Sequence, residues 1–240
     1  QASSAAAAVG FIGAGRALSC MGDLGPANLW MLAVPDGQIA PVATALAALP
    51  LAQKPALAFH CSGALAAAEL MPLKRLGWHI ASAHCLLSFA QPASALAQFE
   101  GTPCAVEGDA AAFAPLHALF GSLGAQCFDL ASADKLLYHA GAVFATNFLP
   151  VLQDVAERLW QHTAMPPALV QQMRVRLLYN AVSNIIQLGP KAALTGPAAR
   201  GDTALVARQG QEVAQWDATA GAAYAALSAL AQGLAKRDAT

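Results

Sequence analysis

The sequence predicts an α/β protein in which an N-terminal parallel sheet is followed by an all-helical C-terminal domain. Two observations give this prediction. Up to about residue 130, short apolar runs alternate with helical patterns, which is typical of a parallel sheet with helices on its faces. Beyond that point no convincing strand pattern occurs. We therefore expect two domains, residues 1–130 and 131–240. No flexible linker is expected at the boundary between them.

The expected strands are short apolar runs, most of them closed by glycine, proline or a polar residue. In chain order they lie at 9–13, 29–34, 56–60, 79–83, 103–107 and 126–129, the last two being weaker. Helical patterns separate them at 39–49, 64–76 and 110–123. In the second domain the expected helices lie at 131–162, 167–188, 203–215 and 217–236.

Composition argues against several classes of protein. Hydrophobic residues make up 57% of the chain and charged residues 11%, and the net charge is −1 without any basic run, which argues against a nucleic-acid partner. No apolar run reaches the roughly 18 residues of a membrane-spanning helix. Low charge without a membrane segment indicates a buried subunit interface, so we expect a homodimer formed mostly by residues after 130.

Cysteine and histidine usage indicates a reducing compartment and no metal site. The five cysteines are odd in number and form no C-x-x-C pair, which favours free thiols in the cytoplasm. The six histidines include no H-E-x-x-H pattern, so no metal is expected. Residues 1–8 lack the charged and apolar regions of a signal peptide, and we interpret them as a tag remnant or a frayed terminus.

The segment 10–16, Gly-Phe-Ile-Gly-Ala-Gly-Arg, carries the first chemical signal. After a strand, Gly13 would permit a tight turn, and Gly15 would let the backbone approach a pyrophosphate at a helix N-terminus. The third glycine of the G-x-G-x-x-G pattern is replaced by Leu18. The segment predicts a Rossmann-type domain that binds NADP or NAD.

The spacing after Arg16 does not suit an intact domain of this kind. Residues 17–28 cannot hold a helix, a second strand and another helix, because one βαβ unit takes about 30 residues. Asp36 lies near the distance expected for a ribose-binding acid but follows the wrong strand, so we reject it. We favour the interpretation that residues are missing immediately after Arg16. The alternative is a natural deletion, which would remove the helix that receives the pyrophosphate.

Several motifs in combination carry a family resemblance. They are the glycine segment, Leu-Ala-Val-Pro-Asp at 32–36, His-Cys-Ser-Gly-Ala-Leu at 60–65, His-Cys-Leu-Leu-Ser-Phe at 84–89, Lys-Leu-Leu-Tyr-His at 135–139 with Asn147, and the turn-rich stretch 189–202. The chain resembles a bacterial family with a Rossmann-like N-terminal domain and a helical C-terminal domain of unknown function. Its relatives include pyrroline-5-carboxylate reductase, the β-hydroxyacid dehydrogenases and deazaflavin-dependent NADP oxidoreductases.

The resemblance implies an NAD(P)-binding fold and a dimer-forming second domain, but it implies no known reaction. Two residues depart from the family pattern: Leu18 replaces a glycine, and Cys85 stands where the family usually has proline. The expected cofactor contacts are Gly10, Gly13, Ala14, Gly15, Arg16, Val34, Pro35 and Ser62.

The catalytic candidates are Lys135 and His139, which are spaced i, i+4 and so share a helix face. At about 100° per residue, Thr146 falls on the same arc with Ala142 between them. The relatives place a lysine and an asparagine at this spacing, where the lysine polarises or protonates the substrate carbonyl during hydride transfer. The alternative is a solvated helix face.

The remaining substrate candidates follow strands or lie in the second domain. Ser62, Gly63 and His84 follow strands at the edge where open α/β sheets bind ligands, and His60 is interpreted as a core histidine. Asn147 falls inside the apolar arc of its helix, where a structural role is favoured. Arg200 would clamp a carboxylate or close its loop by a salt bridge. A polar stripe made of Asn180, Ser183, Asn184 and Gln187 suits a subunit interface better than a cleft.

The sequence thus favours an NADP-dependent reductase of a small carbonyl or imine substrate, with Lys135 as proton donor or electrophile. The alternative is a non-catalytic dimer that senses the cofactor or a metabolite. Lys135 and His139 directed into a cleft would favour the enzyme, and both directed to solvent would favour the sensor.

Overall fold

A computed structural model of the chain describes residues 2–237. By its internal contacts the chain divides into two compact units, Gln1–Asn147 and Phe148–Thr240. The first contains the sheet and the second contains helices. The last strand ends at Asp129, next to the expected end of the sheet domain, and the first compact unit continues beyond it to Asn147.

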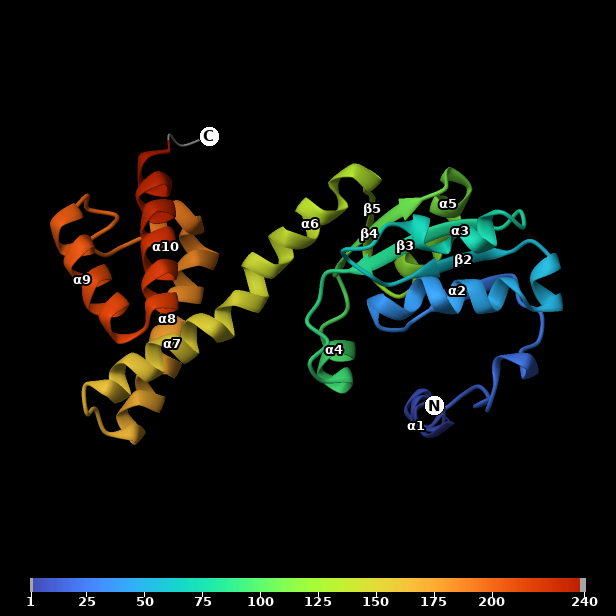
Figure 1. The fold of residues 1–240 in the computed structure, drawn as a ribbon, viewed down its shortest axis with the longest axis horizontal. Helices are drawn as coiled ribbons and strands as arrows, with labels where there is room; N and C mark the ends of the chain where they lie inside the picture. The colour runs from blue at the N-terminus through green and yellow to red at the C-terminus, as the bar shows by residue number, and fades with distance from the viewer. Residues whose placement is uncertain (1, 238–240) are drawn as a thin grey trace. The chain divides into compact units, whose positions relative to one another are not determined.

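A five-stranded sheet forms the centre of the first unit (Figure 1). Its strands adjoin in chain order and are β1 (Leu29–Leu32), β2 (Leu57–His60), β3 (His79–Cys85), β4 (Pro103–Gly108) and β5 (Gln126–Asp129). These strands match all the predicted apolar runs except the first. The strand β2 is buried along its whole length because helices cover both faces of the sheet there.

The sheet is mostly parallel. The pairs β1–β2, β2–β3 and β4–β5 are parallel, whereas β3 and β4 are antiparallel. The α/β prediction is confirmed with this one difference. A parallel return needs a crossover that packs on the sheet, and between β3 and β4 the only helix is the six-residue α4 (Pro92–Ala97), which was not predicted.

Helices cover both faces of the sheet (Figure 1). On one face α2 (Ile39–Ala47) and α3 (Met71–Lys74) enclose a core cluster with Ala58 of β2. On the other face α5 (Ala110–Ser122) packs on Phe59, the next residue of β2. Successive residues of one strand therefore enter opposite cores, as the two-residue period of a strand requires.

The predicted helix at 64–76 is interrupted in the structure. A 3-10 turn at Ala67–Leu70 leads into the short α3 instead. The peptide groups that would begin a longer helix bind side chains: the Ala64 and Leu65 N–H groups donate to Ser62 Oγ, and the Ala67 N–H donates to Glu107 Oε2. Other 3-10 turns lie at Met21–Asp23, Asp36–Gln38, Pro50–Gln53 and Ser132–Asp134.

The expected strand at 9–13 is wrong in this structure. These residues belong largely to α1 (Ala2–Ile12), and Gly13, with φ 75°, closes the helix through a hydrogen bond from its N–H to the Val9 carbonyl. The physical reason is the alanine run before it. Alanine has the highest helix propensity, and a helix makes its hydrogen bonds locally, whereas a strand needs a neighbour.

Residues 14–28 then cross to the sheet with one 3-10 turn and no longer element. No helix of the expected kind begins after Gly15. Among the described residues, β1 pairs with β2 alone, so its other edge is open. Whether residues are missing after Arg16 stays a prediction.

The second unit consists of helices, as predicted. They are α7 (Phe148–His162), α8 (Pro167–Ala193), α9 (Thr203–Trp216) and α10 (Ala218–Lys236). Asp202 caps the N-terminus of α9, because its carboxylate accepts the Leu205 N–H at 3.0 Å. None of the helices in the described part of the chain is long and apolar enough to cross a lipid bilayer.

Candidate active site

A cleft of about 490 Å³ lies within the first unit, beside the end of β3. One wall is the segment that follows β3, and the other is α6 (Lys135–Ala142) with the π-helical turn Val143–Asn147. The lining residues are His84, Leu86, Leu87, Ser88, His139, Ala142, Val143, Ala145, Thr146 and Asn147. Predicted substrate and catalytic residues from two distant parts of the sequence thus meet at this cleft.

Gly63 lies directly against both histidines of the cleft. A Cβ atom at Gly63 would stand 2.5 Å from His139 Cδ2 and 2.7 Å from His84 Nε2. Since nonbonded carbon and nitrogen atoms do not approach so closely, only glycine allows the loop after β2 to come this near to the imidazole rings. The centroids of the two rings are 5.8 Å apart. The loop after β2, the end of β3 and α6 therefore converge on one point.

His84 is neutral at physiological pH and has a fixed hydrogen-bond partner. Burial, followed by the nearby positive charges of Lys135 and His139, lowers the pKa of His84 to about 4. Its Nδ1 atom lies 3.0 Å from the hydroxyl oxygen of Tyr138. If that hydroxyl donates to Nδ1, the proton of the neutral ring is on Nε2, the atom beside Gly63.

The π-helical turn brings Thr146 and Asn147 into the cleft together. The expectation for Thr146, drawn from 100° steps, agrees with its place in the cleft lining. Asn147 was expected inside the apolar arc, and this is wrong: it is exposed and lines the cleft. A π turn holds more residues than an α turn, so the helical angle shifts there. Thr146 Oγ1 donates to the Ala142 carbonyl and lies 2.7 Å from Asn147 Oδ1.

Lys135 does not line the cleft. Its side chain is 1% exposed, and its Nζ donates to Ser82 Oγ at 2.7 Å. Ser82 in turn donates to Glu107 Oε2 at 2.9 Å. Burial lowers the pKa of Lys135, while Glu107 and Asp36 oppose that shift. Lys135 and His139 were expected to share one helix face. In the structure the Lys135 side chain lies in the core, whereas the His139 side chain lines the cleft.

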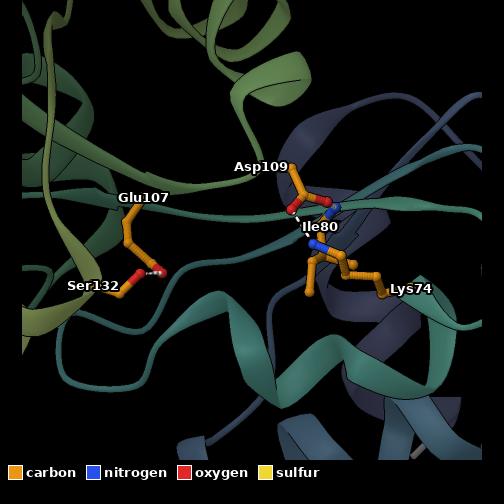
Figure 2. A network of polar contacts seen from close by, with 5 residues as sticks. All are labelled: Lys74, Ile80, Glu107, Asp109 and Ser132. Atoms are coloured by element: carbon orange, nitrogen blue, oxygen red, sulfur yellow. Dashed lines mark hydrogen bonds and ion pairs between the residues drawn. The ribbon is translucent and has the colours of Figure 1, made fainter.

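Glu107 is the centre of this buried network. Figure 2 shows its carboxylate next to Ser132, whose hydroxyl donates to Oε1 at 2.6 Å. The other oxygen accepts from Ser82 and from the Ala67 N–H. A buried carboxylate is tolerated only with such partners. The network joins β3, β4 and the segment before α6 beneath the cleft.

A second polar contact in Figure 2 is structural. Asp109 pairs with the Lys74 ammonium and accepts the Ile80 N–H at 3.1 Å. It fastens α3 to the start of α5 at a place away from the cleft residues, and we assign it no role in chemistry.

The Ser62 side chain stabilises the loop that follows β2. Its Oγ accepts the Ala64 and Leu65 N–H groups at 3.2 and 3.0 Å, and its side chain is buried. His60 is fully buried, accepts the Ser62 N–H at Nδ1, and so donates from Nε2 to the Ala66 carbonyl. The interpretation of His60 as a satisfied core histidine agrees with these contacts.

The glycine segment does not fit a dinucleotide as it stands here. Gly10 lies within α1, and Gly13, Ala14, Gly15 and Arg16 follow it in irregular chain, so no helix N-terminus is available for a pyrophosphate. Val34 and Pro35 do follow β1 at the carboxyl edge of the parallel strands. Of the expected cofactor contacts, those of the glycine segment are therefore not in position to bind a pyrophosphate in this structure.

Arg200 belongs to the second unit, in the turn before α9. Within residues 2–237 it forms no ion pair, so the salt bridge considered for its loop is absent. The same residues contain no group of three or more His, Cys, Asp or Glu side chains that could hold a metal ion.

Sequence reasoning missed three residues of the site: Tyr138, Ser82 and Glu107. Tyr138 had a signal, since it stands inside the Lys-Leu-Leu-Tyr-His motif and an aromatic hydroxyl there needs a partner. Ser82 and Glu107 gave none, because each is a single polar residue between apolar neighbours in its strand, and their pairing depends on the β3–β4 register.

Comparison with solved structures supports the fold. Protein TM1727 from Thermotoga maritima aligns with a TM-score of 0.73 at 24% identity, over 89% of this chain and 81% of that one. A candidate NADP oxidoreductase from Bacteroides fragilis gives 0.68 at 20% identity, over 90% and 80%. Pyrroline-5-carboxylate reductase from Streptococcus pyogenes gives 0.51 at 15% identity, over 86% and 76%. Similarity at these identities shows that this chain has the Rossmann-like fold of these proteins.

A search of curated proteins finds no match. A family model described as a domain of unknown function, DUF2520, matches residues 102–231, more than half of the chain. With the neighbours above, this confirms the predicted resemblance to a Rossmann-like family with a helical C-terminal part. The chain belongs to the DUF2520 family.

Proposed function

We propose that this protein is an NAD(P)-dependent oxidoreductase that reduces a small carbonyl or imine substrate in the cleft beside His84 and His139. The observation that carries the proposal is His84: a neutral imidazole at the carboxyl end of a parallel strand, with Nε2 next to Gly63. Ligands of open α/β sheets bind at this edge. The oxidoreductase fold of the structural neighbours supports the same assignment.

In this proposal His84 polarises the substrate. A neutral imidazole N–H donates a hydrogen bond to a carbonyl oxygen, and that bond strengthens as negative charge develops on the oxygen during reduction. The Tyr138 hydroxyl holds the ring in the required tautomer through Nδ1. His139, the second imidazole of the cleft, is the proposed proton donor to the reduced oxygen or nitrogen.

Thr146 and Asn147 are the proposed substrate-binding residues, on the same wall of the cleft as His139. Both line the cleft and both offer hydrogen-bonding groups. Their mutual contact leaves the Asn147 amide nitrogen free to donate to a polar substituent. A small, polar carbonyl or imine compound suits a cleft of about 490 Å³.

Lys135 acts through His84 in this scheme. Its ammonium is buried on Ser82 and lowers the pKa of His84 by electrostatic repulsion. It is therefore a positioning residue that keeps the imidazole neutral, and direct contact with substrate is not assigned to it.

The cofactor and the assembly complete the proposal. Val34 and Pro35, which follow β1, would hold NADP or NAD together with the glycine segment, and the cofactor would supply the hydride. The helical second unit would join two copies of the chain as a homodimer.

The test is a panel of small carbonyl and imine compounds with NADPH and NADH, followed by loss of cofactor absorbance. We expect turnover of at least one compound, and His84→Gln and His139→Gln to lower kcat by roughly 10²–10⁴-fold. Thr163→Ser, in the turn after α7, is the control. Cofactor binding by calorimetry without turnover of any compound would favour the sensor instead.

A further inference from the structure

Three of the five cysteines stand side by side across the sheet. Cys85 of β3 pairs in register with Cys104 of β4, and Cys104 pairs with Cys127 of β5. Residues directly opposite each other on neighbouring strands point to the same face. All three thiols accordingly belong to the core cluster under α5, and all three are free.

The backbone hydrogen bonds give the spacing of the Cys85–Cys104 pair. Leu86 donates to the Pro103 carbonyl and Asp109 donates to the Ile80 carbonyl, so hydrogen-bonded pairs in this antiparallel ladder fall at residues 80, 82, 84 and 86 of the β3 side. Cys85 and Cys104 are therefore a non-hydrogen-bonded pair, whose Cα atoms lie about 4.5 Å apart. That spacing is within the range of about 4.4–6.8 Å found for disulfides.

The two thiols differ in exposure. Cys104 is 0% exposed, whereas Cys85 is half-buried at the end of its strand and within reach of a small oxidant. The hydrogen bond from the Cys104 thiol lowers the pKa of Cys85, and the same contact with burial raises the pKa of Cys104. Thiolate character is thus concentrated on the sulfur that solvent can reach, which is the reactive form of cysteine.

We propose that Cys85 and Cys104 form an oxidisable pair that a hydroperoxide converts to a cross-strand disulfide. The Cys85 thiolate attacks one peroxide oxygen, the O–O bond breaks, and the leaving oxygen departs as water or an alcohol after taking a proton. The sulfenic acid formed on Cys85 is then attacked by the Cys104 sulfur. The S–O bond breaks, the oxygen leaves with the Cys104 proton as water, and the S–S bond forms. Two thiols lose two electrons and one peroxide gains them.

The disulfide would change the shape of the cleft, because Cys85 lies between His84 and Leu86 in the chain and both of these residues line the cleft. A bond from Cys85 to the buried Cys104 fixes the end of β3 to β4. The oxidised protein should therefore differ from the reduced one in how its cleft binds ligands.

The experiment is disulfide mapping of the full chain. Protein reduced and freed of reductant is treated with one equivalent of hydrogen peroxide, alkylated, denatured and digested at glutamate. Cleavage after Glu69, Glu100 and Glu107 puts Cys85, Cys104 and Cys127 on separate peptides. We expect the peptides 70–100 and 101–107 to be linked, lighter by two hydrogen atoms than their sum, and to separate on reduction.

Variants make the assignment specific. Cys85→Ser and Cys104→Ser should each abolish the linked species, whereas Cys127→Ser, Cys61→Ser and Cys20→Ser should leave it intact. A link from Cys85 to Cys61 or Cys127, or oxidation of Cys85 to a sulfinic acid without any link, would overturn the proposal. Because the wild-type map stands by itself, a variant that fails to fold does not remove the test.

Discussion

His84 Nδ1 lies 3.0 Å from the Tyr138 hydroxyl oxygen, and its Nε2 lies on the opposite side of the ring, beside Gly63 and the cleft. One imidazole thus joins a half-buried tyrosine to the place where a substrate would bind. Burial raises the pKa of that tyrosine to about 12, so its hydroxyl keeps its proton. The first prediction follows from the charge state of this pair.

We predict that stability falls as the pH is lowered from about 6.5 to about 4. The pKa of His84 is about 4 in the folded protein and about 6.5 in the unfolded chain, so between these values only the unfolded state binds the proton. The loss should be at most about 3 kcal/mol from this residue, at about 1.4 kcal/mol per pKa unit.

Urea unfolding at a series of pH values measures this dependence. His60, whose pKa is also lowered by burial, contributes in the same direction, so the variant difference is the decisive quantity. His84→Gln should flatten the acid limb, and the exposed His162→Gln should not. Equal pH dependence in wild type and His84→Gln would contradict the prediction.

Gly63→Ala should disturb both histidines of the cleft. The new methyl group would stand 2.5–2.7 Å from the two rings, and the rings can move apart only by giving up their present contacts. We expect a loss of roughly 1–3 kcal/mol of unfolding free energy, as for other overpacked sites, and weaker ligand binding.

Gly141→Ala is the matched control, because nothing lies within 4 Å of a Cβ atom there and the residue is in α6. It should be neutral or stabilising by up to about 1 kcal/mol. If thermal denaturation gives the same midpoint for both variants, the tight contact at Gly63 is refuted.

Lys135→Met should destabilise the fold as well as lower any turnover. The substitution leaves Ser82 and the Glu107 carboxylate in the core without the ammonium that balances them. We expect a cost of roughly 1–3 kcal/mol, the usual cost of an unpaired buried polar group. A lysine that acted only as a proton donor would change turnover while stability stayed the same.

The double variant Lys135→Met/Glu107→Gln separates the two roles. If the residues are coupled through Ser82, the double variant should lose less stability than the sum of the single variants. Additive losses in chemical unfolding would show that the network does not couple them.

The second unit carries a prediction about assembly. Val175, Tyr179, Val182 and Ile186 of α8 repeat at spacings of 4, 3 and 4 residues, and they are 59%, 77%, 39% and 78% exposed in the single chain. Such a row on one helix face is the pattern of a helix–helix interface. We predict a homodimer, and Ile186→Glu should convert it to monomer.

Light scattering at micromolar concentration measures the mass directly. Gln211→Glu adds the same charge on the neighbouring α9 and should leave the dimer intact. A wild-type chain that is monomeric at this concentration would rule the interface out.

The parts of the fold that the sequence predicted share a physical cause. The strand β2 is buried along its whole length, and strands of this kind appear in the sequence as continuous apolar runs. The antiparallel β3–β4 pairing was not visible, because it depends on what fills the connection between the strands. The prediction of a strand at 9–13 was wrong. The strand that it would pair with, β1, is separated from it by the mostly irregular residues 14–28.

The site was predicted to a similar extent. The i, i+4 spacing brought Lys135 and His139 to one helix face, but their difference in depth came from Glu107, a residue of another strand. The 100° rule placed Thr146 and misplaced Asn147, because one π-helical turn shifts the angle. The periodicity of the sequence therefore predicts which face of a helix a side chain lies on. How deeply that side chain is buried depends on its tertiary contacts.

The open edge of β1 leads to the last prediction, that the natural coding sequence holds further residues between Arg16 and Leu29. Within the described residues β1 pairs with β2 alone, and Met31 is 60% exposed. Phe11 and Ile12 are 57% and 69% exposed in α1, and they would become buried if residues 9–13 formed a strand parallel to β1 at that edge. A strand at 9–13 can reach this edge only if a crossover of about 30 residues or more follows it.

Sequencing the coding region should therefore show an insertion, and the intact protein should exceed 24.5 kDa. In that protein the Met31 amide should be protected from hydrogen exchange as in a central strand. Uninterrupted codons from Arg16 to Ala17 would contradict the prediction and would leave the glycine segment without a pyrophosphate to bind.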